Sequence, residues 1–151
     1  MRLSELLSEE TITISLSHDD KNGVIEELLD VAMKSGQIKD RAVALKAVLD
    51  REALMSTGLE RGVAVPHAKT NAVENITMAL GVSADGIDFE SADGGKSHIF
   101  FFLLAPESAA AANVQVLAQI ARLTSDVEFT KEMKAAETPA EALKTIKDLE
   151  I

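Results

Sequence analysis

The sequence contains no cysteine, tryptophan or tyrosine, and its only aromatic residues are five phenylalanines. The absence of cysteine excludes disulfide bonds, thiolate catalysis and the usual zinc–thiolate sites. The longest apolar run, Ile99 to Ala105, is far too short to span a bilayer, and residues 1–10 lack the apolar stretch of a signal peptide. These absences favour the cytoplasm as the compartment, and they predict that any work at a membrane goes through a partner.

Positive charge is also scarce. Lysine and arginine together number 15 against 25 aspartates and glutamates, which gives a formal net charge of -10. Such an excess of negative charge repels phosphate backbones and anionic membranes unless a basic patch is concentrated locally. No basic run is present, so the sequence predicts neither nucleic-acid binding nor direct membrane insertion.

The three prolines and eight glycines form no linker that would divide the chain. A hydrophobic fraction of 46% with 26% charged residues is typical of a globular protein. A length of 151 residues is enough for one compact domain with a buried core. We therefore predict that residues 1–151 form a single domain with a mostly aliphatic core.

Apolar periodicity predicts a mixture of strands and helices. Alternation over Thr11–Leu16 is typical of a half-buried strand, whereas residues 99–104 are apolar on both faces and are expected to form a central strand. Further strands are expected at 62–65 and 76–82, with a turn at 84–86. Helices are expected at 20–36, 40–52 and 109–124, followed by two more with capping boxes that begin at Ser125 and Thr138. The predicted fold class is α/β, a three-layer sandwich with a central mixed β-sheet flanked by helices.

His67 is the residue on which the functional interpretation depends. It follows the short apolar strand that starts at Gly62, and Pro66 is expected to end that strand because proline cannot donate to a sheet ladder. Ligands and chemistry in α/β domains gather at strand ends. The alternative is that His67 is a structural histidine whose ring nitrogens are satisfied by hydrogen bonds within the fold.

Other candidate sites are weaker. Gly94–Ser97 resembles the end of a phosphate-binding loop, but the required earlier glycine is replaced by Glu90 and a strand follows instead of a helix. His18 lies beside two aspartates that a helix N-terminus explains without a metal, and His98 begins a buried strand. The sequence predicts no metal and no cofactor.

Positive charge near His67 would suit a phosphoryl group bound to its ring. Arg51, Arg61 and Lys69 are near His67 in the sequence, and an arginine fork with hydroxyl or backbone N–H donors would hold such a group. These cations are also expected to lower the pKa of the imidazole and keep the ring neutral and nucleophilic. Taken singly, Arg51 and Arg61 are equally well explained as ordinary surface charges.

Three segments resemble a known family. They are Arg51 to Gly58 (Arg-Glu-Ala-Leu-Met-Ser-Thr-Gly), Gly62 to Ala68 (Gly-Val-Ala-Val-Pro-His-Ala), and Phe101 to Pro106 with the later Leu117–Leu123 helix. In this order they resemble the type-2 IIA domain of the phosphoenolpyruvate-dependent sugar phosphotransferase system, the fructose, mannitol and nitrogen-regulatory class. The resemblance covers almost the whole chain.

The resemblance implies that His67 accepts a phosphoryl group from the carrier HPr and passes it to a cysteine on a IIB domain, with Arg51 contacting the group. The Ser-Thr-Gly element makes Ser56 and Thr57 candidate supports. Family members commonly carry a second histidine where this chain has Asn113, whose amide can donate to a phosphate oxygen but cannot carry a proton charge. Because phosphoryl transfer mainly needs positioning and charge neutralisation, this difference is expected to slow transfer rather than prevent it.

Three functions remain open at this stage. The first is a phosphocarrier in sugar uptake with HPr and a IIB domain or subunit as partners. The second is a nitrogen-regulatory phosphoprotein that binds targets according to its phosphorylation state. The third is a degenerate binding module in which Asn113 marks lost phosphotransfer, since one fold can serve several functions.

Overall fold

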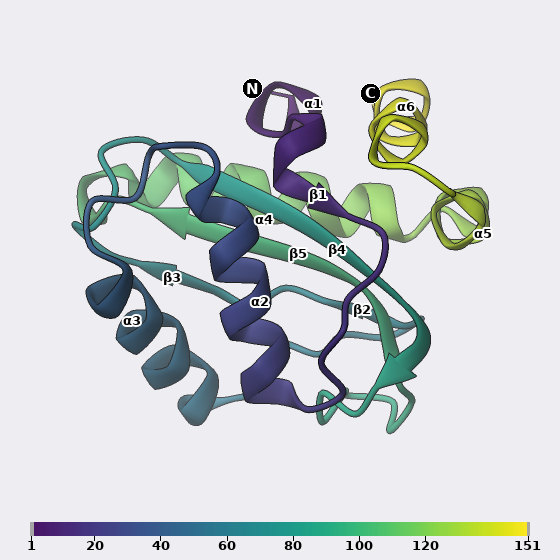
Figure 1. Ribbon diagram of the computed structural model, residues 1–151, viewed down its shortest axis with the longest axis horizontal. Coiled ribbons are helices and arrows are strands. Elements are labelled where there is room, and N and C mark those ends of the chain that lie inside the picture. Colours follow the sequence, from purple (N-terminus) through teal and green to yellow (C-terminus); the bar gives the residue numbers. More distant parts are fainter. Residues whose placement is uncertain (1, 151) are drawn as a thin grey trace.

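The computed structural model describes residues 2–150, and over this range a five-stranded sheet is covered by helices on both faces (Figure 1). The strands are β1 (Ile12–Thr13), β2 (Val63–Ala64), β3 (His67–Lys69), β4 (Thr77–Ile87) and β5 (Ser97–Ala105). The helices are α1 (Leu3–Leu6), α2 (Lys21–Met33), α3 (Arg41–Leu54), α4 (Ala110–Thr124), α5 (Val127–Ala135) and α6 (Pro139–Leu149). Short 3-10 turns, η1 (Glu9–Thr11) and η2 (Glu107–Ala109), precede β1 and α4.

The sheet is mixed, with the order β1-β4-β5-β2 and with β3 also pairing β5. The β4 and β5 strands are antiparallel, whereas β1 lies parallel to β4 and both β2 and β3 lie parallel to β5. The β5 strand is therefore paired along both edges, as its apolar run 99–105 predicts. The predicted three-layer α/β sandwich with a central mixed sheet is confirmed.

Alternating side chains of β5 contribute to two separate cores. Phe100, Phe102 and Leu104 pack with α2 and α3 on one face. Ile99, Phe101 and Leu103 pack on the other face with side chains from α1, α4, α5 and α6. Figure 1 shows α2 and α3 in front of the sheet and α4 behind it. Because the strand period is two, one apolar run supplies both faces.

The helices begin where polar side chains cap them. The side chains of Asp20 and Asp40 accept the backbone N–H groups of Gly23 and Val43 and so start α2 and α3 as expected. Thr138 caps α6 in the same way. The predicted Ser125 cap is wrong: Asp126 caps α5, while Ser125 ends α4 and its hydroxyl donates to the carbonyl of Arg122.

Strand boundaries differ from the expectation at two places. The strand expected over Thr11–Leu16 shrinks to the two residues of β1, because η1 includes Thr11 and the chain bends at Ile14. The turn expected at residues 84–86 is instead part of β4, where a register shift between Val82 and Ile87 absorbs the extra residues. Gly86 makes this irregularity accessible, since its φ is 81°.

Pro66 interrupts the sheet without ending it. It closes β2 and His67 follows the end of that strand, as expected, but His67 also starts β3, a strand that the sequence did not predict. The reason is that Pro66 lacks only the N–H group, and its carbonyl still accepts the N–H of Leu103 at 3.1 Å. The chain stays beside β5, and pairing resumes with His67 opposite Leu103.

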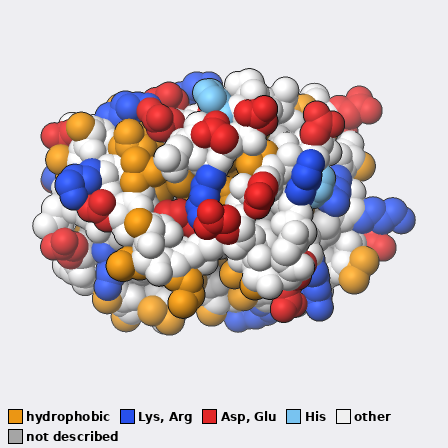
Figure 2. Space-filling view, turned by 90° about the horizontal axis from the view of Figure 1, so that it is seen from below, with side chains coloured by type: hydrophobic (Ala, Val, Ile, Leu, Met, Phe, Trp, Pro, Cys, Tyr) orange, Lys and Arg blue, Asp and Glu red, His pale blue; other side chains and the backbone are white. Residues whose placement is uncertain are grey.

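Within residues 2–150, none of the helices combines the length and the apolar character needed to cross a bilayer. The face of the molecule seen in Figure 2 carries acidic, basic and hydrophobic side chains intermixed, without a continuous basic surface.

Candidate active site around His67

His67 opens into a pocket of about 470 Å³. The pocket is bordered by the last turns of α3, the β3 strand and the start of α4, segments that are distant in sequence. Its lining residues are Ala47, Arg51, His67, Ala68, Lys69, Glu107 and Asn113. The structure therefore brings together three of the predicted site residues, Arg51, His67 and Asn113.

The His67 ring is oriented by the backbone just before it. Its Nδ1 atom lies 2.7 Å from the carbonyl oxygen of Val65. A carbonyl can only accept a hydrogen bond, so in the neutral ring Nδ1 must carry the proton. The lone pair is therefore on Nε2, the nitrogen that remains available to attack an electrophile in the pocket.

The pKa of His67 lies below its usual value of 6.5, and burial is the largest cause. The positive charge of Arg51 lowers this pKa as well, whereas the hydrogen bond to Val65 and the charge of Glu52 act in the opposite direction. Desolvation disfavours the charged imidazolium, so the ring is neutral at pH 7. Burial thus contributes more to the nucleophilic state than the cations to which the sequence pointed.

Arg51 lies in the last turn of α3, at the end of the helix where a cation is favoured by the helix dipole. Its Nη1 atom donates to the carbonyl of Met55 at 3.0 Å, which fixes the guanidinium while leaving other N–H donors for a ligand. No carboxylate within residues 2–150 forms an ion pair with it. A guanidinium so placed can pair with two oxygens of one phosphoryl group.

Asn113, in the first turn of α4, is 7% exposed. Its side-chain oxygen Oδ1 is buried and has no hydrogen-bond partner among the described residues. Buried polar atoms are nearly always satisfied, and exceptions concentrate at functional sites. The amide group is therefore held in the pocket wall at a cost to the free protein.

Ser56 and Thr57 do not line the pocket. The hydroxyl of Ser56 donates to the carbonyl of Phe89 at 2.6 Å, and that of Thr57 donates to the carboxylate of Glu52 at 2.5 Å. Both hydroxyls are thus engaged in holding the loop after α3. Their predicted support of a phosphoryl group stays a prediction.

The three cations near His67 in sequence separate in space. Arg51 and Lys69 line the His67 pocket, but Arg61 lies against α4, where its Nη1 atom donates to the carbonyl of Ser125 at 2.8 Å. Arg61 is near His67 in the sequence but not in space, because the left-handed backbone at Arg61, with a φ of 63°, turns the chain away from the pocket before β2 begins.

Sequence reasoning missed Glu107 as a pocket residue. It follows Pro106 directly after β5, and its carboxylate accepts the side-chain amide of Asn71 at 3.1 Å. The strand-end argument that singled out His67 applies equally to this residue and could have found it.

The other two histidines lie outside the pocket. His18 is exposed and its ring contacts Glu27 at 2.7 Å, a hydrogen bond that raises the pKa of His18. The Nδ1 atom of His98 lies 3.0 Å from the carbonyl of Ser83, a contact within the β4–β5 pair. Over residues 2–150 no cluster of three or more histidine, aspartate or glutamate side chains is arranged to hold a metal ion.

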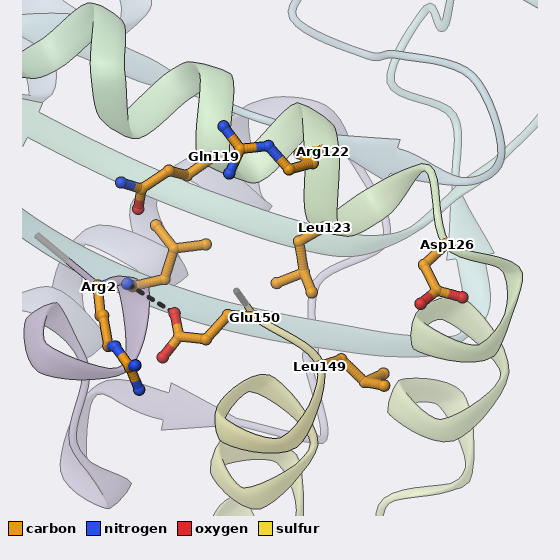
Figure 3. A pocket seen from close by; sticks show the side chains of 8 residues that line it. Arg2, Gln119, Arg122, Leu123, Asp126, Leu149 and Glu150 are labelled. Atoms are coloured by element: carbon orange, nitrogen blue, oxygen red, sulfur yellow. Dashed lines mark hydrogen bonds between the residues drawn. The ribbon is translucent and has the colours of Figure 1, made fainter.

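A second, smaller cavity of about 90 Å³ lies between α1, α4 and the end of α6 (Figure 3). The Glu150 carboxylate accepts the backbone N–H of Leu3 at 2.9 Å there and also binds the hydroxyl of Ser4. These bonds tie residue 150 to the start of α1. Among the described residues, no histidine lines this cavity, whereas His67 lines the larger pocket.

Residues 5–149 match the family model described as phosphoenolpyruvate-dependent sugar phosphotransferase system, EIIA 2. The chain belongs to this family. The family match confirms the resemblance read from the Arg51–Gly58 and Gly62–Ala68 segments.

Relatives in the EIIA 2 family include sugar-specific and regulatory proteins. The chain is 38% identical over 138 residues to the fructose-specific EIIABC component of Bacillus subtilis, covering 91% of this chain but only 22% of that protein. It is 35% identical to the fructose-specific EIIA component of Haloferax volcanii and 36% identical to a nitrogen regulatory protein of Bradyrhizobium diazoefficiens. Each of these two matches covers 90% of this chain and 88% of the relative.

Solved EIIA structures share the fold. The nitrogen regulatory protein IIA-Ntr of Neisseria meningitidis superimposes with a TM-score of 0.88 at 25% identity, covering 95% of this chain and 98% of that one. The Escherichia coli mannitol enzyme IIA, solved as a complex with phosphorylated enzyme IIB, gives 0.81 at 19% identity, with coverage of 94% and 97%.

Proposed function

We propose that residues 1–151 act as one type-2 IIA domain whose His67 is a transient phosphoryl carrier. Nε2 of His67 attacks the phosphorus of a phosphohistidine on HPr, the new P–N bond forms, and the P–N bond to the donor breaks with its electron pair returning to the donor ring. The group then passes to the thiolate of a IIB cysteine, and the electron pair of the breaking P–N bond returns to Nε2. The observation that carries the proposal is the Nε2 lone pair, fixed by Val65 and opening into a pocket shared with Arg51.

Four of the pocket residues have a role in this transfer. The neutral ring of His67 is the nucleophile, and Arg51 with Lys69 offsets the charge on the transferring oxygens. The amide of Asn113 supplies a further donor. Since the transition state is loose, positioning and charge neutralisation carry most of the catalysis.

The partners follow from the chemistry and from the relatives. A IIA domain needs a phosphohistidine donor, for which HPr is the proposed protein, and a thiolate acceptor, for which a IIB domain or subunit is proposed. The solved mannitol IIA–IIB complex supports the second partner, because that IIA shares this fold. The proposed compartment is the cytoplasm. The absence of cysteine agrees with this, because the fold needs no disulfide bond and hence no oxidising compartment.

The direct test is labelling with radioactive phosphoenolpyruvate, enzyme I and HPr. We expect one acid-labile phosphate on the wild-type chain and none on His67→Ala. His18→Ala is the matched control, since it also removes a histidine ring, but an exposed one outside the pocket. Undiminished label on His67→Ala would refute the assignment.

A second candidate is a nitrogen-regulatory phosphoprotein that delivers nothing to a sugar permease. The observations that favour it are the 36% identity to the Bradyrhizobium regulatory protein and the TM-score of 0.88 to IIA-Ntr. The two candidates share the labelling result and differ in the next step. Fast transfer from the labelled chain to a cognate IIB domain supports the carrier, and stable label in the presence of that IIB domain supports the regulator.

A further inference from the structure

An ion pair with a buried carboxylate lies next to Arg51 on α3. The Glu52 carboxylate, on α3 next to Arg51, is 7% exposed, and the Nζ atom of Lys21, the first residue of α2, is 2.8 Å from it. Lys21 also lies 5.0 Å from the centroid of the Phe89 ring. The Lys21 side chain is 18% exposed and its Nζ atom also lies 3.3 Å from the exposed Glu90, so the buried member of the pair is the carboxylate. A buried carboxylate is unfavourable unless a counter-charge and hydrogen bonds satisfy it, so Glu52 calls for an explanation.

The remaining bonds of Glu52 all go to one residue. Its Oε2 atom accepts the backbone N–H of Thr57 at 2.8 Å, and its Oε1 atom accepts the Thr57 hydroxyl at 2.5 Å. Glu52 thus holds Thr57 by two bonds while Lys21 neutralises the charge. Three donors converge on this carboxylate.

Thr57 connects this pair to the nucleophile through the backbone. The Thr57 carbonyl accepts the N–H of Val65 at 3.0 Å, and the Val65 carbonyl accepts Nδ1 of His67 at 2.7 Å. Arg51 precedes Glu52 on the same helix turn, and its guanidinium donates to the carbonyl of Met55 in the same loop. The carboxylate therefore lies at the junction of the segments that hold His67 and Arg51.

Resting on the function proposed above, we propose that Glu52, with Lys21 as its counter-ion, is a positioning residue for phosphoryl transfer. By fixing Thr57 it fixes the Val65 carbonyl, which selects the His67 tautomer with the proton on Nδ1 and the lone pair on Nε2. The same anchor fixes the end of α3 and hence the direction of the Arg51 guanidinium. Glu52 touches neither the substrate nor the reacting nitrogen. The negative charge of Glu52 raises the pKa of His67, against the effect of burial. This electrostatic interaction is further support that Glu52 lies close enough to His67 to influence it.

The main test replaces Glu52 by glutamine. Glutamine matches the shape, but its NH₂ group would face one of three donors, so at least one bond to Thr57 or Lys21 is lost. We expect phosphoryl transfer from phospho-HPr to slow by about 10- to 100-fold, since a small misplacement of a reacting group can cost about 100-fold in rate. The concentration of HPr that gives half-maximal rate should stay unchanged, because the partner's surface is untouched.

A spectroscopic readout separates positioning from a loss of stability. In ¹⁵N NMR of the ring nitrogens, wild-type His67 should be a single tautomer protonated on Nδ1, and Glu52→Gln should show a mixture of tautomers. Glu74→Gln is the matched control, since Glu74 also has a lysine at 2.8 Å but is exposed. It should keep both the rate and the tautomer.

A second pair of variants keeps the test decisive if Glu52→Gln fails to fold. Thr57→Val removes the hydroxyl that donates to Glu52, and Thr57→Ser retains it. Slower transfer and mixed tautomers in Thr57→Val, with Thr57→Ser restoring both, support the proposal. A folded Glu52→Gln or Thr57→Val chain with the wild-type rate and a single Nδ1-protonated tautomer overturns it. If wild-type protein accepts no label, the phosphocarrier function fails, and the tautomer comparison still decides whether Glu52 orients the ring.

Discussion

Replacing Asn113 by leucine should stabilise the free protein while slowing phosphoryl transfer. The buried Oδ1 atom has no partner, and leaving a polar group in that state costs about 1–3 kcal/mol. Leucine removes the atom, keeps the branched shape and is a better helix former by a few tenths of a kcal/mol. The open pocket beside it gives room for the extra volume, so overpacking is limited. We expect the free energy of unfolding to rise by about 1–2 kcal/mol, or roughly 2–8 °C in Tm for a chain of this length.

The same change should weaken transfer because the pocket loses an N–H donor. A hydrogen bond to a charged group contributes about 1.5–3 kcal/mol, which corresponds to a rate lowered about 10- to 150-fold. Urea unfolding and single-turnover transfer from phospho-HPr measure the two effects. Val127→Ala, at a 75% exposed position on α5, is the control and should change neither beyond about 0.5 kcal/mol. A leucine variant that unfolds more easily than wild type and still transfers at the wild-type rate would refute the reasoning.

Three further expectations concern other parts of the chain. Arg51→Lys should slow labelling of His67 by at least about 10-fold, measured in the same single-turnover assay, because a point charge replaces a two-pronged donor; an unchanged rate would show that the fork makes no contact. The rate of His67 labelling should fall as the pH is lowered, with a midpoint below pH 6.5, because the pKa of the ring is lowered and only the neutral form attacks. The contribution of this ring to the free energy of unfolding is likewise fully present above pH 6.5 and is lost as the pH falls through the folded-state pKa. Gly86→Ala should lower the free energy of unfolding by about 2–4 kcal/mol, because φ is +81° and the new Cβ would lie 2.7 Å from the His98 ring. The control Gly36→Ala, with φ +73° and no atom within 4 Å of the new Cβ, should lower it by only about 1–2 kcal/mol. Equal losses for the two variants in urea unfolding would contradict the predicted clash with His98.

The layers of the fold could be predicted from the sequence because their signals are local. Residues 99–105 of β5 are all apolar and therefore had to be covered on both faces. On α2 the apolar pattern predicts one inward face, and its members are all buried: Val24, Ile25, Leu28, Leu29 and Ala32. On α3 the apolar pattern favours Val43 and Ala47, with Ala44 and Val48 as further inward positions; Ala44 and Val48 are buried, Ala47 is partly buried and Val43 is 48% exposed, because only one stripe of that helix reaches the sheet.

The site was harder to predict because its members meet only in the folded chain. His67 could be found from its own surroundings, whereas Arg51 and Asn113 were placed with it by family resemblance. Nothing in the sequence separates Arg61 from Arg51 as a neighbour of His67, since what separates them is the backbone turn at Arg61. Glu52 carried no signal, because its partner Lys21 is distant in sequence and their contact depends on how α2 and α3 pack.

Pro66 has a different role from the one that the sequence indicates. Ala64 pairs with Phe100 and His67 with Leu103, so both strands advance by three residues and the register of β2 continues into β3 unbroken. The N–H of Leu103 is taken by the Pro66 carbonyl. Neighbouring carbonyls along a strand point to opposite sides, so the Val65 carbonyl faces away from β5 and is free to accept from a side chain. That free acceptor, two residues before the histidine, is what holds Nδ1. The proline thus marks a strand edge where one backbone carbonyl is left to orient the nucleophile, and it does not mark the end of the sheet.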